Sequence, residues 1–215
     1  TNTYAPLNVL KDKFEEALSF ENVIGLSIST RPDCLEDDVV EYLGELNKRT
    51  NLWVELGLQT IHDVTSKKIN RGHDYNTFLE GLKKLQDRNI KVIVHIINGL
   101  PGEDREMMLQ TARTLSHLKL HSVKIHLLHV LKGTVMAKQL ADGEFELLSR
   151  EEYVQTVCDQ LELFPPELVI QRVTGDGEKE SLIGPEWSLK KLCVMNEIDK
   201  ELVRRDSWQG KNYIR

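Results

Sequence analysis

Five short segments rich in valine, isoleucine and leucine recur along the chain, each bounded by turn residues or by a helical pattern. We predict strands over Val23–Ser29, Trp53–Thr60, Lys91–Asn98, Val123–Val130 and Leu168–Thr174. Amphipathic stretches alternate with them and predict helices over Leu7–Ser19, Glu36–Lys48, Tyr75–Arg88, Arg105–Leu118, Ser149–Leu163 and Ser188–Arg205. This alternation predicts an α/β fold with a parallel sheet, open or curled, whose strands are too few to close an eight-stranded barrel.

Within the predicted strands, apolar residues occupy one face and polar residues gather on the other. Alternation places five polar side chains on corresponding faces: Glu55, Gln59, His95, Lys124 and His126. Taken singly, each is more often a satisfied core polar group than a ligand-binding residue. Together they favour a hydrated or ligand-filled concavity, because unpaired charges in a dry layer would cost roughly several kcal/mol each.

In parallel α/β folds, ligands bind at the carboxyl ends of the strands, which here carry Ser29, Gln59, Asn98 and Val130. Gln59 is the most informative of these, since Arg71 follows it twelve residues later in the loop before the next helix. An amide and a guanidinium at this edge suit a ligand that has both hydroxyls and a carboxylate. The alternative is a glutamine that satisfies loop backbone and a surface arginine in a helix-capping turn.

Composition narrows the class of protein. Hydrophobic residues make up 40% and charged residues 29% of the chain, as in ordinary globular proteins. The net charge of -6 argues against a general nucleic-acid-binding surface but leaves room for a local basic groove. The three scattered cysteines form no disulfide framework or CxxC site, which favours a reducing, cytoplasmic location. No apolar run has membrane-spanning length, and the first ten residues lack a signal-peptide pattern.

Four motifs follow one another in a characteristic order: GLSISTRPDCL, ELGLQT with INRGHD, HIINGLPGE and LLHVLKGT. Together they resemble the radical S-adenosylmethionine superfamily, in particular the branch of the oxygen-independent coproporphyrinogen oxidases and the elongator-type enzymes. Two further segments, TGDGEKESLIGPEWSLKK and RRDSWQGK, are similar to one uncharacterised bacterial subgroup. The resemblance covers essentially the whole chain.

The resemblance implies a partial, TIM-like β/α barrel that holds a [4Fe–4S] cluster and S-adenosylmethionine at its mouth. Reductive cleavage of the cofactor would give a 5′-deoxyadenosyl radical that abstracts hydrogen from a substrate. Gln59 matches the residue that binds the ribose, and Arg71 matches the residue that pairs with the methionyl carboxylate. The other positions implied to face the cofactor are Ser29, which replaces an acidic residue, His95, which replaces an aspartate, Asn2 and Thr3 near its amino group, and Val130 and Leu131 near its adenine.

The sequence departs from the superfamily at the cluster. The cluster is normally held by a CxxxCxxC motif after the first barrel strand, and this chain contains no such motif. We therefore expect no metal ligands here, with the first barrel strands missing from residues 1–215. We also expect one domain, in which residues 175–215 form a loop and a terminal helix, and no radical chemistry from this stretch alone.

Two other hypotheses remain open at this stage. One is a cluster-independent barrel enzyme, such as an aldolase or isomerase, with Lys124, Glu55 or His95 as acid–base groups. The other is a non-catalytic binding module of degenerate radical descent. For the radical enzyme, we expect an RNA or small-molecule substrate, an electron donor such as flavodoxin or ferredoxin, and no membrane. The acidic balance mildly disfavours RNA.

Overall fold

A computed structural model describes residues 2–175 and 177–214 of the protein. Thr1, Asp176 and Arg215, which the predicted domain includes, lie outside the described residues. Five strands form one sheet in the order β1-β2-β3-β4-β6, and every neighbouring pair is parallel. Their bounds are β1 Gly25–Thr30, β2 Asn51–Gln59, β3 Lys91–Asn98, β4 Ser122–Leu127 and β6 Val169–Arg172. The predicted parallel α/β sheet is confirmed.

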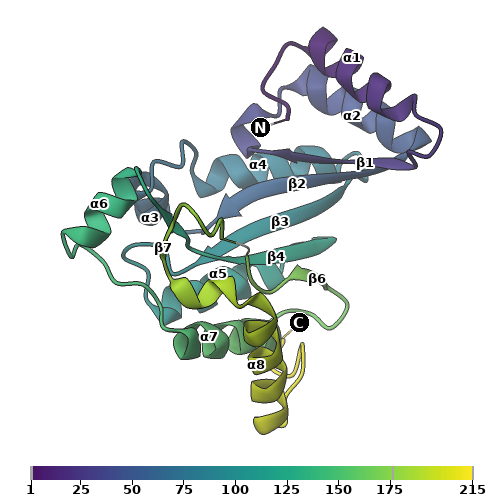
Figure 1. Ribbon diagram of the computed structural model, residues 1–215. Coiled ribbons are helices and arrows are strands. Elements are labelled where there is room, and N and C mark those ends of the chain that lie inside the picture. The colour runs from purple at the N-terminus through teal and green to yellow at the C-terminus, as the bar shows by residue number, and fades with distance from the viewer. Residues whose placement is uncertain (1, 176, 215) are drawn as a thin grey trace.

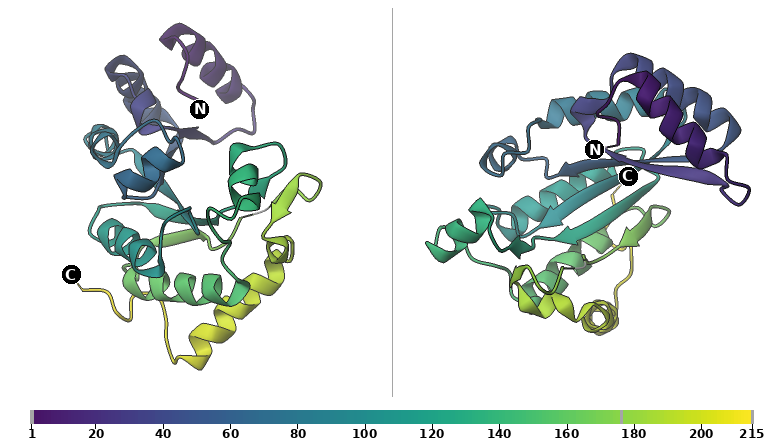
Figure 2. Two further views of the ribbon diagram at one scale, coloured as in Figure 1. Left: turned by 90° about the vertical axis from the view of Figure 1, so that its left-hand side faces the viewer. Right: turned by 45° about the horizontal axis from the view of Figure 1, so that its top comes forward.

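Helices connect consecutive strands and lie mainly on one side of the sheet (Figures 1 and 2). The six predicted helices are all present, as α1 Leu7–Leu18, α2 Asp37–Arg49, α4 Tyr75–Gln86, α5 Arg105–Ser116, α7 Arg150–Leu163 and α8 Lys191–Arg204. Their starts follow from local chemistry: the Asp74 carboxylate accepts a hydrogen bond from the Thr77 backbone N–H, as expected of an N-cap. Ser149 and Glu152 form a capping box that begins α7.

The two faces of the sheet differ as the alternation predicts. Inward residues such as Val54, Leu56, Val94 and Ile125 are fully buried against the helices. We call the opposite side the polar face and define it by Ser27, Ser29, Glu55, Gly57, Gln59, His95, Lys124 and His126, none of which is classed as buried. The hydrophobic core therefore lies between sheet and helices, and polar side chains remain on the other side.

The carboxyl end of β4 departs from the prediction. A single strand over Val123–Val130 is wrong, because β4 ends at Leu127 and the chain turns away. Val130–Leu131 forms a separate strand, β5, which pairs antiparallel with β7 at Leu182–Gly184. The apolar run continues past Leu127 because Leu128 and Val130 join a second small core with Leu100. Hydrophobicity alone could not separate the two environments.

Two short helices and two 3-10 turns were also not predicted. They are α3 Asp63–Lys68, α6 Val135–Ala141, η1 Pro32–Cys34 and η2 Glu186–Leu189. The first strand begins at Gly25, so Val23 and Ile24 lie outside the sheet, and Ile24 is exposed. Helices α3 and α6 lie near the carboxyl ends of the strands, together with β5 and β7 (Figure 1). Among the described residues, no helix is long and apolar enough to cross a membrane.

Candidate functional site

Gln59 and Arg71 lie side by side at the carboxyl end of β2. Both side chains cross Gly57: a Cβ atom there would stand 2.5 Å from Arg71 Nη2 and 3.0 Å from Gln59 Nε2. Arg71 Nη2 also donates a hydrogen bond of 2.7 Å to the Gly57 carbonyl oxygen. Only a residue without a side chain leaves room for both groups at position 57. The expectation that the amide and the guanidinium meet on the polar face is confirmed.

The backbone of β2 is distorted where it delivers Gln59. The pairing of β2 with β3 shifts register between Gly57 and Gln59, and Gln59 has a φ of 75°. A positive φ is unfavourable for glutamine, and bulges of this kind redirect side chains next to binding sites. The bulge keeps Leu58 in the core, where it is 1% exposed, and turns Gln59 back toward Gly57.

Arg71 has an incomplete set of partners. Its Nε atom is buried and has no hydrogen-bond partner among the described residues. Burial lowers the pKa of Arg71, and the nearby Arg31 guanidinium lowers it further. Arg31 itself pairs with Asp33, so that carboxylate already has a cationic partner. A carboxylate ligand would supply the charge and the acceptor that Arg71 lacks. Arg71 also lines a pocket of about 330 Å³ beside α3.

A second group of polar side chains lies on the polar face around Glu55. Lys124 Nζ donates to Glu55 Oε2 at 2.7 Å, and His95 Nε2 lies 2.8 Å from the same oxygen. Ser27 donates to the other carboxylate oxygen at 2.8 Å. His126 Nε2 lies 3.2 Å from His95 Nδ1, and the two imidazole rings are stacked. We call Ser27, Glu55, His95, Lys124 and His126 the Glu55 cluster.

The charges of the Glu55 cluster follow from these contacts. Burial alone would raise the pKa of Glu55, but the hydrogen bonds from Lys124 and Ser27 outweigh it and bring the pKa to about 2. Burial lowers the pKa of His126 to about 4, helped by His95 and by the cations Arg172 and Lys124. Burial also lowers the pKa of His95, although Glu55 opposes that shift. At neutral pH the cluster therefore has an ionised carboxylate and two neutral imidazoles.

Of the other predicted cofactor contacts, only His95 is placed near Gln59 and Arg71 by the strand pairing. His95 stands opposite Gly57 in the pairing of β2 with β3, close to Gln59 and Arg71. Asn2 pairs with the backbone of Ser29 on β1, through its own N–H at 2.9 Å and its side-chain oxygen at 3.0 Å. Thr3 is buried, and its hydroxyl donates to the Cys34 carbonyl oxygen at 2.6 Å. Their proposed contacts with a cofactor stay predictions.

Val130 and Leu131 lie in the small β5–β7 sheet, which is separate from the five-stranded sheet that carries Gln59. Val130 is fully buried, and Leu131 is partly exposed. Asn98 ends β3 but points away from the polar face, because its amide pairs with Gln160 of α7 in both directions, at 2.8 and 2.9 Å. Gly57 was missed as a site residue, although its place between Glu55 and Gln59 in the alternation was a usable signal.

Metal ligands do not gather in the part of the chain that the structure describes. Cys34 and Cys158 are buried, Cys193 is exposed, and all three are free thiols. No group of three or more His, Cys, Asp or Glu side chains among the described residues could hold a metal ion. An iron–sulfur cluster therefore has no ligand set within residues 2–175 and 177–214.

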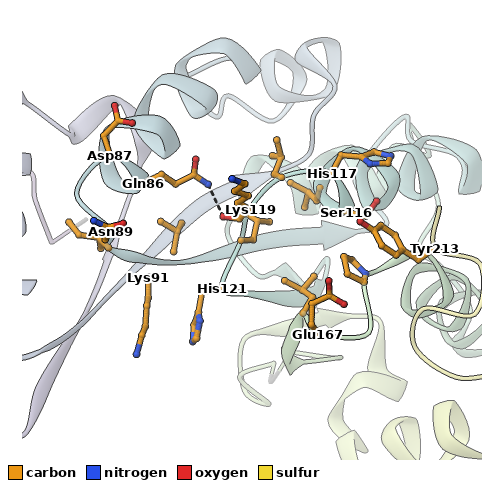
Figure 3. A pocket seen from close by; sticks show the side chains of 17 residues that line it. Gln86, Asp87, Asn89, Lys91, Ser116, His117, Lys119, His121, Glu167 and Tyr213 are labelled. Carbon is orange, nitrogen blue, oxygen red and sulfur yellow. Dashed lines mark hydrogen bonds between the residues drawn. The ribbon is translucent and has the colours of Figure 1, made fainter. Parts of the chain in front are cut away.

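A larger pocket of about 790 Å³ lies at the opposite, amino-terminal ends of the strands. Figure 3 shows side chains from the start of β3 and from the loops before β4 and β6, including Lys91, His121 and Glu167. Among the labelled side chains, Gln86 Nε2 donates a hydrogen bond of 2.7 Å to the Lys119 carbonyl oxygen. Ligand sites of parallel α/β folds occupy the other end, so size alone does not make this pocket the functional site.

Comparison with known proteins identifies the family of the chain. The family profile described as Radical SAM superfamily matches residues 2–115, and the Radical_SAM C-terminal domain matches residues 120–204. The chain is 57% identical to the uncharacterized protein YtqA of Bacillus subtilis over 215 residues, which are all of this chain and 67% of YtqA. The chain thus spans about two thirds of the length of that relative.

Solved structures show the same fold. An N-terminally truncated Elp3 from Methanocaldococcus infernus matches 93% of this chain and 46% of its own, with a TM-score of 0.77 and 22% identity. Coproporphyrinogen III oxidase (HemN) from Escherichia coli, described as a radical SAM enzyme, matches 92% of this chain and 36% of its own, with a TM-score of 0.50 and 16% identity. The sheet is thus the partial barrel that the resemblance implied. The profile match over residues 2–115 shows that the chain belongs to the radical SAM superfamily.

Proposed function

We propose that this chain forms the cofactor-facing part of a radical SAM enzyme, and that Gln59 and Arg71 hold S-adenosylmethionine at the carboxyl end of β2. One observation carries the proposal: a partly buried guanidinium with an unpartnered Nε atom lies beside a glutamine amide on the polar face. A methionyl carboxylate would satisfy the former, and ribose hydroxyls would satisfy the latter.

The residues present fit S-adenosylmethionine, which when bound to a reduced cluster supplies a 5′-deoxyadenosyl radical able to abstract hydrogen. Arg71 would fix the carboxylate end, because its guanidinium is already oriented by the Gly57 carbonyl oxygen. Gln59 would orient the ribose, since the bulge in β2 holds its amide over Gly57. These contacts position the cofactor and contribute no proton or electron themselves.

The residues present do not fit the [4Fe–4S] cluster, because the described residues bring no three ligands together. We therefore propose that the thiolates belong to the remaining length that relatives such as YtqA possess. A reduced flavodoxin or ferredoxin would supply the electron, and a cytoplasmic location would suit that chemistry. The substrate remains RNA or a small molecule, with the net charge of -6 in favour of a small molecule.

The hypothesis of a cluster-independent aldolase has lost support. A Schiff-base lysine must present a neutral amine to its substrate, whereas the Lys124 ammonium donates to Glu55 at 2.7 Å. The same salt bridge occupies Glu55, the second acid–base candidate. The non-catalytic hypothesis gives no reason for a buried Arg71 whose Nε atom has no hydrogen-bond partner among the described residues, so we prefer the cofactor site.

Calorimetry on the full-length protein tests the proposal. Arg71→Ala should weaken binding of S-adenosylmethionine by about 2–4 kcal/mol, since the carboxylate loses a hydrogen-bonded charge partner. Arg113→Ala is the matched control, because Arg113 pairs with Glu106 on α5 and lies away from the polar face. Equal affinity of the Arg71 variant, the control and the wild type would remove Arg71 from the cofactor site.

A further inference from the structure

The Glu55 cluster fixes the positions of the protons on two imidazole rings. An ionised carboxylate only accepts hydrogen bonds, so His95 must carry its proton on Nε2, which faces Glu55 at 2.8 Å. A neutral His95 then has a bare Nδ1. His126 Nε2 lies 3.2 Å from that atom and must therefore be the donor. A neutral imidazole has only one N–H group, so Nδ1 of a neutral His126 carries no proton.

The surroundings of the His126 ring keep it neutral. His126 Nδ1 has no hydrogen-bond partner among the described residues, and the atom is not completely buried. The nearest glycine is Gly175, where a Cβ would stand 3.8 Å from it. The charged and titratable groups that face the two rings are Glu55 from β2, Lys124 from β4, Arg172 from β6 and His129 from the loop after β4.

We propose that His126 Nδ1 is the proton acceptor for the substrate of this enzyme, with His95 and Glu55 as positioning residues. The inference rests on the proposed function and adds the substrate's chemical class: a polar molecule that presents an O–H or N–H group to the polar face. The proton leaves the substrate heteroatom, which keeps the electron pair, and bonds to Nδ1. The Nε2 proton of His126 then moves to His95 Nδ1, and Glu55 stabilises the resulting imidazolium.

This relay gives a role to contacts of the Glu55 cluster that Gln59 and Arg71 do not explain. Glu55 lies four residues before Gln59 on the same strand, and Lys124, His95 and Ser27 occupy its carboxylate oxygens. The stacked imidazoles run from Glu55 toward β4 and Gly175. Among the described residues, His126 ends this row of rings with an Nδ1 acceptor that has no hydrogen-bond partner.

Two measurements on the full-length protein test the proposal. Nitrogen-15 NMR of histidine-labelled protein at pH 7 should show that the signal lost in His126→Gln belongs to a neutral ring protonated at Nε2. A ring protonated at Nδ1, or an imidazolium, would overturn the proposal. In His95→Phe the acceptor of His126 Nε2 is gone, so the wild-type single tautomer should become a mixture, which a space-filling role for His95 would not produce.

The second measurement is carbethoxylation by diethyl pyrocarbonate, mapped by mass spectrometry, since the reagent attacks only an accessible, unprotonated imidazole nitrogen. Between pH 7 and pH 5, the His126 rate should fall less than about twofold, while N-acetylhistidine amide with an ordinary pKa falls about 25-fold. No modification at either pH, or a fall matching the free amide, would overturn the proposal. Affinity for S-adenosylmethionine should be unchanged in His126→Gln, so failure here is distinct from failure of Arg71→Ala.

Discussion

The depressed pKa of His126 should make the folded protein less stable in mild acid. The pKa of this ring falls from the ordinary 6.5 to about 4 because the ring is buried among His95, Arg172 and Lys124. As the pH falls below 6.5, the unfolded chain takes up this proton and the folded chain does not. The unfolded state is thus favoured increasingly until the pH reaches about 4, below which both states are protonated.

The size of the effect follows from the two pKa values. Between pH 7 and pH 5, a single group shifted from 6.5 to about 4 lowers the free energy of unfolding by about 2 kcal/mol. Urea unfolding followed by circular dichroism at both pH values measures this loss. Because other groups also titrate, the informative quantity is the loss in the wild type minus the loss in His126→Gln, which should be about 2 kcal/mol.

The matched control is His117→Gln, since His117 is an exposed residue at the end of α5 and far from the polar face. Its loss between pH 7 and pH 5 should equal that of the wild type within experimental error. If the losses of the wild type and of His126→Gln were the same, the ring would be protonated equally readily in both states. Burial among cations would then not govern its charge, and the tautomer argument would lose its basis.

Three further changes test other parts of the structure. Gly57→Ala should weaken S-adenosylmethionine binding about tenfold or more in calorimetry, because a Cβ 2.5 Å from Arg71 Nη2 forces the guanidinium away; unchanged affinity would contradict the packing at Gly57. Asn98→Leu should lower the free energy of unfolding by about 1–3 kcal/mol, because the buried Gln160 amide loses its hydrogen-bond partner. The double variant with Gln160→Leu should recover much of this loss. A double variant whose loss equals the sum of the two single losses would refute the pairing. Glu55→Gln should destabilise by about 3 kcal/mol at pH 7, because Lys124 loses its partner. Since the pKa of Glu55 is depressed to about 2, this difference should shrink as the pH falls from 4.5 toward 2, and a constant difference in urea unfolding would exclude the ion pair as its source.

Much of the site was predictable because strand alternation assigns each residue to a face. The period of two placed Glu55 and Gln59 on the same side of β2, and the parallel arrangement brought Gln59 to the edge where the following loop supplies Arg71. Alternation also put Asn98 on the face opposite His95, where it pairs with Gln160. From its place at a strand end, Asn98 was expected to face the ligand site. Its amide instead pairs with Gln160 on α7, which is distant in the chain.

The sequence by itself determined the parallel sheet, its apolar and polar faces, and the strand end that carries Gln59, since these depend on local periodicity and chain direction. Only the tertiary structure decided that Glu55 contacts both Lys124 and His95. It also decided that a hydrogen bond between the rings of His95 and His126 sets the tautomer of each. Contacts between strands depend on register, which the bulge between Gly57 and Gln59 alters. A pattern along one strand does not contain that information, because register is set jointly by the packing of neighbouring strands and helices.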